Sequence, residues 1–270
     1  MLRPVVLKLG GELLEDVSRT RALATEIARA PATTPVAVVH GGGREIDAAL
    51  AKAGIPKQQV DGIRVTDRPT LDVVVSVLAG AINTRFVAAI NAAGGRALGL
   101  TGADAGVAPV EPMPPFRSAA GEIVSLGLVG QPVRDGVPHL VSHLIDGGYV
   151  PVVATIGAGA DGMLYNVNAD TMAAALAVRL NASRLLIAGT TPGVLDADGK
   201  TIAELRPQRE RELAVAGTVN RGMLAKLQAC RAALAGGVGE VAILDGRDPA
   251  RLRAALAGED GAAASMTRVK

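Results

Sequence analysis

Short, almost continuously apolar runs alternate along the chain with longer patterns of helical periodicity. The runs lie at 5–9, 36–40, 96–100, 150–154, 184–188 and 241–245. Such runs are typical of strands buried on both faces of a parallel sheet. Helical patterns occupy about 18–30, 44–53, 68–93, 138–147, 170–180, 222–235 and 248–256. The alternation predicts a three-layer αβα sandwich with a mainly parallel central sheet and right-handed crossovers.

The segment 103–136 interrupts this alternation. It is rich in Pro and Gly and contains only short pieces of alternating polarity. Such a segment predicts hairpins rather than a helical crossover. We therefore expect a flap over one face of the molecule.

Composition narrows the class of protein. Hydrophobic residues make up 49% of the 270 residues and aromatic residues only 1%, so Ala, Val, Leu and Ile must form the core. The net charge is +2. Without stacking aromatics or dense positive charge, we expect no nucleic-acid partner. We find no signal peptide and no apolar stretch of the roughly 18 residues that a membrane span needs, which predicts a cytoplasmic protein without a membrane partner. Cys230 is the only cysteine and is expected in the core.

Polar residues at strand ends carry the candidate chemistry, because ligands of open α/β sheets bind beyond the carboxyl ends of the strands. Lys8 lies inside an apolar run that Gly10 and Gly11 follow. A buried lysine needs an anionic partner. Either an internal ion pair satisfies Lys8, or the strand holds this lysine where it meets a phosphate.

The sequence HGGGREI, residues 40–46, follows the second run. It matches neither the dinucleotide fingerprint nor a Walker loop. It does offer a row of backbone N–H groups that leads into a helix N-terminus, which favours an anion. His40 is interpreted as a hydrogen-bonding residue at the strand end rather than a catalyst or metal ligand, because no second His stands at ligand spacing.

Two further segments add charge. Asn166, Asn168 and Asp170 precede a helical pattern, and Lys226 stands one turn into another. Individually these residues are consistent with helix caps and a surface lysine. Two lysines, one carboxylate and glycine-rich turns, without a nucleophile–base pair, together favour phosphoryl transfer, which depends on positioning and charge neutralisation.

Six motifs in this chain resemble those of the amino acid kinase family, in the same order and at similar spacings. They are KLGGE (8–12), VVHGGGREI (38–46), DGIRVTD (61–67), NVNAD (166–170), PGVLDADG (192–199) and GMLAKL (222–227). The likeness is greatest to the branch that phosphorylates N-acetyl-L-glutamate. It implies an open αβα sandwich whose N-terminal lobe, 1–165, binds the acylated amino acid and dimerises, while residues 166–270 bind the nucleotide.

The same resemblance implies roles for individual residues. Lys8 and Lys226 would flank the transferred phosphoryl group, and Asp170 would hold their ammonium groups. Phosphate oxygens would contact Gly10, Gly11 and Gly43. The cofactor would be ATP with Mg²⁺ bound mainly through the phosphates, without a protein metal site.

Substrate and nucleotide residues follow from the resemblance as well. The acylated amino acid would contact Gly42, Gly43, Arg64 and Asn166, with the planar Arg64 group clamping a carboxylate. The nucleotide would lie against Thr190, Thr191, Pro192, Gly193, Val194, Leu195, Thr218, Val219 and Asn220. The implied reaction converts ATP and N-acetyl-L-glutamate into N-acetyl-L-glutamyl 5-phosphate, a step of arginine biosynthesis.

Several alternatives stay open. Thr190 stands where the family usually has Asp, which leaves nucleotide preference open. The substrate could instead be N-succinylglutamate, or glutamate or α-aminoadipate on a carrier protein. A non-catalytic metabolite sensor is the alternative from another class. We expect a homodimer rather than a hexamer, with the 68–93 helix as dimer contact or as an ordinary core helix.

Overall fold

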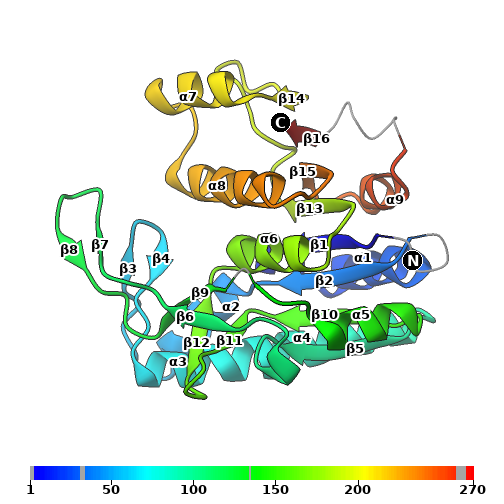
Figure 1. The fold of residues 1–270 in the computed structure, drawn as a ribbon, viewed down its shortest axis with the longest axis horizontal. Coiled ribbons are helices and arrows are strands. Elements are labelled where there is room, and N and C mark those ends of the chain that lie inside the picture. The colour runs from blue at the N-terminus through cyan, green and yellow to red at the C-terminus, as the bar shows by residue number, and fades with distance from the viewer. Residues whose placement is uncertain (1–2, 31–33, 134, 260–265) are drawn as a thin grey trace.

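The computed structural model describes residues 3–30, 34–133, 135–259 and 266–270. In these residues an eight-stranded sheet forms the middle layer, in the order β14-β16-β15-β13-β1-β2-β10-β5 (Figure 1). The strands are β1 (Val5–Leu9), β2 (Val36–His40), β5 (Ala97–Thr101), β10 (Val150–Ala154), β13 (Arg184–Gly189), β14 (Glu204–Leu205), β15 (Glu240–Asp245) and β16 (Met266–Val269). All neighbours are parallel except β15 and β16. The predicted mainly parallel sheet is confirmed.

Helices cover both faces of this sheet, and alternation along β1 determines which residues meet which layer. Leu7 and Leu9 belong to one core cluster, whereas Val6 belongs to the other. The first cluster includes residues of α1 (Val17–Arg29), α2 (Gly43–Lys52), α3 (Arg68–Val75), α4 (Asn83–Ala92) and α9 (Pro249–Ala257). The second includes residues of α5 (His139–Asp146), α6 (Ala169–Arg179), α7 (Pro207–Val215) and α8 (Arg221–Ala235).

The long helix expected at 68–93 is continuous but not uniform. A π-helical segment, η3 (Ser76–Ile82), joins α3 to α4. The helix Arg68–Ala92 is long and apolar enough to cross a membrane by length and composition, contrary to the expectation from the sequence. Its apolar residues Leu78, Ile82, Phe86 and Ile90 are buried in the first core cluster. Packing on the sheet thus accounts for the apolar residues on this face of the helix.

The interrupting segment forms the expected hairpins. β7 (Phe116–Arg117) pairs with β8 (Ile123–Val124), and this hairpin extends away from the central sheet beside the hairpin of β3 (Gln59–Val60) and β4 (Ile63–Arg64) (Figure 1). The rest of the segment is not a free flap. β6 (Val110–Pro112) and β9 (Val129–Pro132) join β11 (Ile156–Ala158) and β12 (Leu164–Val167) in a second sheet, ordered β11-β12-β9-β6.

The two expected lobes share the central sheet. Strands β2, β10 and β5 lie on one side of β1, and β13 to β16 lie on the other (Figure 1). The expected boundary after residue 165 falls inside β12, and α6 from the second half contacts β1 and β2. The functional division between the lobes stays a prediction.

Candidate active site

A cleft of about 260 Å³ opens at the carboxyl ends of β1 and β2. The glycine turns after these strands, the β3–β4 hairpin and the start of α6 form its walls. Of the expected site residues, the cleft is lined by Lys8, Gly10, Gly11, Gly42, Gly43, Arg64, Asn166 and Asp170. The structure therefore brings together eight residues from four separate parts of the chain.

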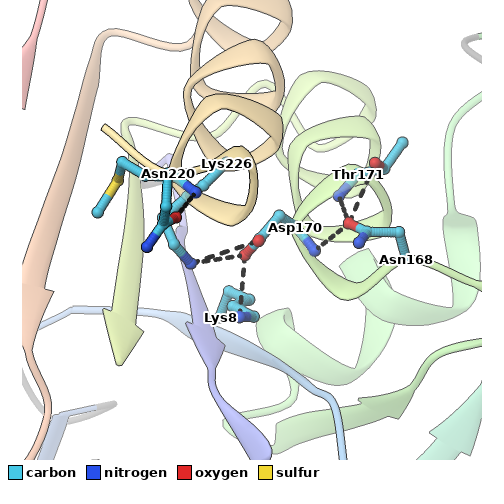
Figure 2. A network of polar contacts seen from close by, with 7 residues as sticks. Lys8, Asn168, Asp170, Thr171, Asn220 and Lys226 are labelled. Carbon is cyan, nitrogen blue, oxygen red and sulfur yellow. Dashed lines mark hydrogen bonds and ion pairs between the residues drawn. The ribbon is translucent and has the colours of Figure 1, made fainter. Parts of the chain in front are cut away.

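Asp170 joins the two lysines (Figure 2). The Lys8 Nζ atom lies 2.9 Å from Asp170 Oδ1, and Lys226 Nζ lies 3.3 Å from Asp170 Oδ2. Asp170 stands at the start of α6, where Asn168 is the N-cap residue and its Oδ1 accepts from the N–H groups of Asp170 and Thr171. Lys8 and Val6 are two residues apart on β1 and therefore point to the same face of the sheet, the one that α6 covers. The Lys8 side chain thus reaches this carboxylate.

Burial and charge act against each other in this group. Burial would raise the pKa of Asp170, but Lys8 and Lys226 lower it below its ordinary value. Burial, together with the charge of Lys8, lowers the pKa of Lys226 even though Asp170 opposes that shift. When all three are ionised, two positive charges face one negative charge, which leaves a net positive charge in a largely buried place. Such a site favours an anion.

The glycine turns after β1 and β2 pack against each other through their main chains. A Cβ atom on Gly11 would collide with the backbone of Gly42. A Cβ atom on Gly42 would collide with Leu78 and Ile82, whereas one on Gly43 would meet nothing within 4 Å. Gly42 thus lines the cleft as expected, and its lack of a side chain leaves room for Leu78 and Ile82 of the π-helical segment. Gly43 opens the N-terminus of α2, where the N-cap residue Gly42 provides no side chain to cap the first N–H groups, which favours an anion.

Arg64 is buried on β4, and only some of its guanidinium N–H groups have hydrogen-bond partners among the described residues. Its Nη2 donates to Asp47 Oδ1 at 2.5 Å and to the Gly43 carbonyl at 3.4 Å. Its Nη1 is buried without a hydrogen-bond partner in the described part of the chain. Nearby, Asn166 Nδ2 donates to Thr66 Oγ1 at 3.1 Å. Since an unpaired buried N–H is unfavourable, an anionic oxygen would complete the Arg64 group.

His40 has the hydrogen-bonding role expected from the sequence. It is fully buried, and its Nε2 lies 3.1 Å from Asn83 Nδ2. Burial lowers its pKa to about 4, so the ring is neutral at neutral pH. A neutral Nε2 acceptor and an Nδ1–H donor toward the Gly41 carbonyl, 3.2 Å away, satisfy both nitrogens. His40 therefore packs behind the glycine loop.

The expected nucleotide residues are not among those lining this cleft. Thr190 and Thr191 directly follow β13 and are exposed, while Val194 donates its N–H to Thr267 Oγ1 of β16 at 2.8 Å. Thr218 and the buried Val219 precede Asn220, the N-cap residue of α8. Asn220 therefore begins the helix that carries Lys226 (Figure 2). Nucleotide contact at these loops stays a prediction.

Two acidic residues of the site were missed from the sequence. Asp47 on α2 pairs with both Arg64 and Lys57, and Glu12 lines the cleft directly after the first glycine turn. Glu12 could have been found, because it directly follows Gly10 and Gly11. Asp47 could not, since its pairing depends on where the β3–β4 hairpin folds. Within the described ranges, no three His, Cys, Asp or Glu side chains are grouped to hold a metal ion.

Fold and site together define an α/β enzyme that handles phosphate: lysines, glycine turns and a helix N-terminus converge where parallel strands end. Residues 3–245 match the model of the amino acid kinase family. The chain belongs to this family, as its motifs predicted.

The relatives of this chain agree with that assignment. An acetylglutamate kinase of Dinoroseobacter shibae is 41% identical over 266 residues, which cover 98% of this chain and 89% of that protein. An acetylglutamate kinase of Zymomonas mobilis subsp. mobilis is also 41% identical, over 95% of this chain and 87% of its own.

Solved structures show the same fold. N-acetylglutamate synthase from Neisseria gonorrhoeae, complexed with coenzyme A and N-acetyl-glutamate, superposes with a TM-score of 0.82 at 23% identity. The match covers 99% of this chain and 59% of that one. A carbamate kinase from Giardia gives a TM-score of 0.67 at 16% identity, covering 99% of this chain and 98% of its own.

Proposed function

We propose that this chain transfers the γ-phosphoryl group of ATP to the γ-carboxylate of N-acetyl-L-glutamate, giving N-acetyl-L-glutamyl 5-phosphate and ADP in arginine biosynthesis. Relatives of about the same length that are named acetylglutamate kinase support the substrate. The observation that carries the chemistry is the pairing of Lys8 and Lys226 through Asp170.

The reaction needs little from the protein beyond positioning and charge. An oxygen of the substrate carboxylate attacks the γ-phosphorus as the bond to the bridging oxygen of ADP breaks. The carboxylate is already ionised, so no general base is required. Lys8 on one side and Lys226 on the other would neutralise charge on the transferred group, while Gly11 and Gly43 would donate N–H groups.

Mg²⁺ would accompany the nucleotide, and the donors of the site fit a metal held mainly by phosphate oxygens. Asp170 is already bound by two ammonium groups, and the described residues contain no cluster of three or more potential ligands. Magnesium commonly uses few protein carboxylates together with substrate phosphates. When bound, the ion would neutralise phosphate charge.

Arg64 is proposed to bind a carboxylate of the acylated amino acid through the unpaired Nη1. Arg64→Lys keeps the positive charge but removes the planar donor set, and we expect the KM for N-acetylglutamate to rise about 10- to 100-fold with a smaller change in kcat. Arg68→Lys is the matched control, because Arg68 is exposed and its ion pair is with Asp72 on its own helix. Equal KM values in the two variants would remove Arg64 from the substrate site.

One experiment tests the function and its alternatives. Purified protein is mixed with Mg-ATP, hydroxylamine and either N-acetylglutamate, N-succinylglutamate or free glutamate, and acyl phosphate is trapped as the hydroxamate. We expect product with N-acetylglutamate. Product only with N-succinylglutamate would reassign the acyl group. No product with either acylated glutamate would overturn the proposal and leave a carrier-linked substrate or a metabolite sensor.

We also propose a homodimer through the helix Arg68–Ala92. A groove of about 470 Å³ lies between α4 and β5, and β5 is the last strand of the sheet in the described residues. Leu98 of β5 and the small residue Ala88 of α4 are exposed there. A second copy would cover the open strand edge. Light scattering at micromolar concentration should give the mass of a dimer. Ala88→Arg places a large charged side chain in the groove and should reduce the measured mass toward that of a monomer. A monomer mass for the unsubstituted protein would contradict the dimer.

A further inference from the structure

Glu12 is a carboxylate of the cleft that the proposed reaction has not used. It is the second residue of a short 3₁₀ helix, η1 (Gly11–Leu13), directly after the first glycine turn. Its carboxylate folds back over the main chain: Oε1 lies so close to Gly10 that it would collide with a Cβ atom there, and 3.4 Å from the position that a Cβ atom on Gly189 would take. The carboxylate therefore lies between the carboxyl ends of β1 and β13.

The other acidic side chains at this edge are neutralised by cations. Asp170 binds the two lysines, Asp47 binds Arg64 and Lys57, and Asp245 at the end of β15 binds Arg247. Glu12 differs, because nothing in the described ranges donates a hydrogen bond to its carboxylate or forms an ion pair with it. Its main-chain oxygen accepts a hydrogen bond from the Arg19 Nη1 atom at 3.1 Å. Among the described residues, Glu12 is thus a half-buried carboxylate of the cleft that forms no ion pair.

Such a carboxylate would repel a polyphosphate bound at the adjacent glycine turns unless a cation lies between them. Magnesium fits this arrangement, since it prefers oxygen ligands and is typically bound by one or two carboxylates together with substrate phosphates. Asp170 cannot take that part without releasing its lysines. On the basis of the proposed function, we infer that Glu12 is the protein's own oxygen ligand for the Mg²⁺ ion that accompanies the nucleotide.

Nucleotide binding as a function of metal tests this role without turnover. The Kd of a non-hydrolysable ATP analogue is measured by calorimetry with saturating Mg²⁺ and again with EDTA. For the unsubstituted protein we expect Mg²⁺ to strengthen binding. In Glu12→Gln the strengthening by Mg²⁺ should fall about tenfold or more, while affinity in EDTA is unchanged or higher, because the repulsion has been removed.

The matched control is Glu15→Gln, three residues further along. Glu15 is exposed and forms a surface ion pair with Arg44 at 3.4 Å, so the substitution removes the same charge at a residue that does not line the cleft. This variant should retain the Mg²⁺ dependence of the unsubstituted protein. Glu12→Asp, which keeps the charge on a shorter side chain, should give an intermediate value, and circular dichroism checks that each variant is folded.

A second readout observes the metal itself. With Mn²⁺ in place of Mg²⁺, the electron paramagnetic resonance spectrum of the nucleotide complex should change between the unsubstituted protein and Glu12→Gln. Equal metal dependence of the Kd and identical spectra would overturn the role of Glu12 while leaving the kinase proposal intact. Failure of the unsubstituted protein to bind any nucleotide would overturn both.

Discussion

The neighbouring ends of β1 and β2 present similar sequences but use their polar residues in opposite ways. Lys8 and His40 each precede a run of glycines, and the two strands pair in parallel, with Lys8 opposite Val39 and His40 opposite Leu9. Lys8 is an ion-paired residue that lines the cleft. His40 is fully buried, bound to Asn83 and neutral at neutral pH.

The face of the sheet explains the difference. Lys8 and His40 point to opposite faces of the sheet. Lys8 faces α6 and α8, which supply Asp170 and Lys226. His40 points to the other side, where α4 supplies Asn83. A polar residue at a strand end therefore joins the charged group of the cleft only when the helix layer it faces carries its partners. A shift of one residue along the strand would turn the side chain toward the other helix layer.

The largest expected effect comes from removing the charge on the catalytic face. Lys8→Ala and Lys226→Ala should each lower kcat by about 10²- to 10³-fold, because the transferred phosphoryl group loses a positive charge. Hydroxamate formation under saturating substrates measures turnover, and thermal unfolding shows whether the fold persists. Turnover close to that of the unsubstituted protein in either variant would exclude that lysine from the mechanism.

Asp170→Asn should come next, with a loss of about 10²-fold in kcat, because the lysines lose the carboxylate that holds them. It also removes the charge that raises the pKa of Lys226, which then stays beside Lys8. Since loss of the Lys226 proton removes a positive charge, the alkaline limb of kcat should move to lower pH. An unchanged alkaline limb in a pH–rate profile would separate Asp170 from Lys226.

On the His40 face the effect should be on stability rather than turnover. Its pKa is about 4 in the folded chain, against about 6.5 unfolded, so between these values the unfolded chain binds the extra proton. The free energy of unfolding should therefore fall as the pH drops through this window, by about 3 kcal/mol at most. Urea titrations at several pH values measure this slope. If His40→Gln shows the same slope, the proton binds elsewhere.

The smallest effects should separate two adjacent glycines. Gly42→Ala places a methyl group against Leu78 and Ile82 and should lower the free energy of unfolding by about 1 to 3 kcal/mol. Gly43→Ala meets no atom, and should change it by less than about 0.5 kcal/mol while raising the KM of the acceptor. Chemical denaturation compares them. Equal stability losses would show that the π-helical segment yields to Gly42→Ala.

The sequence predicted those parts of the fold that repeat a local pattern. All six apolar runs are strands of the central sheet, and the helical patterns between them are helices, within one or two residues at most ends. The helix Pro207–Val215 was missed because its charged sequence has little apolar periodicity. The strand Met266–Val269 was missed because it pairs only with β14 and β15, which are far from it along the chain.

The candidate site was predictable where the sequence places a charged residue in an apolar segment or at the start of a helix. A lysine inside an apolar strand and an aspartate at a helix start are visible in sequence, and the structure places them 2.9 Å apart. The reason for Gly42 was not visible, because Leu78 and Ile82 come from a helix that is distant in sequence. The unpaired state of the Arg64 Nη1 atom likewise depends on Asp47 occupying the other nitrogen.

The rate at which the Cys230 thiol is alkylated can report how often the candidate site opens. It is the only cysteine of the sequence, it is buried as expected, and it lies one helical turn beyond Lys226 on α8. Burial raises the pKa of its thiol to about 12, so we expect alkylating reagents to react with it only when the packing around α8 opens. Ligands that hold Lys226 should slow the labelling, which makes the rate a measure of local opening that is distinct from global unfolding.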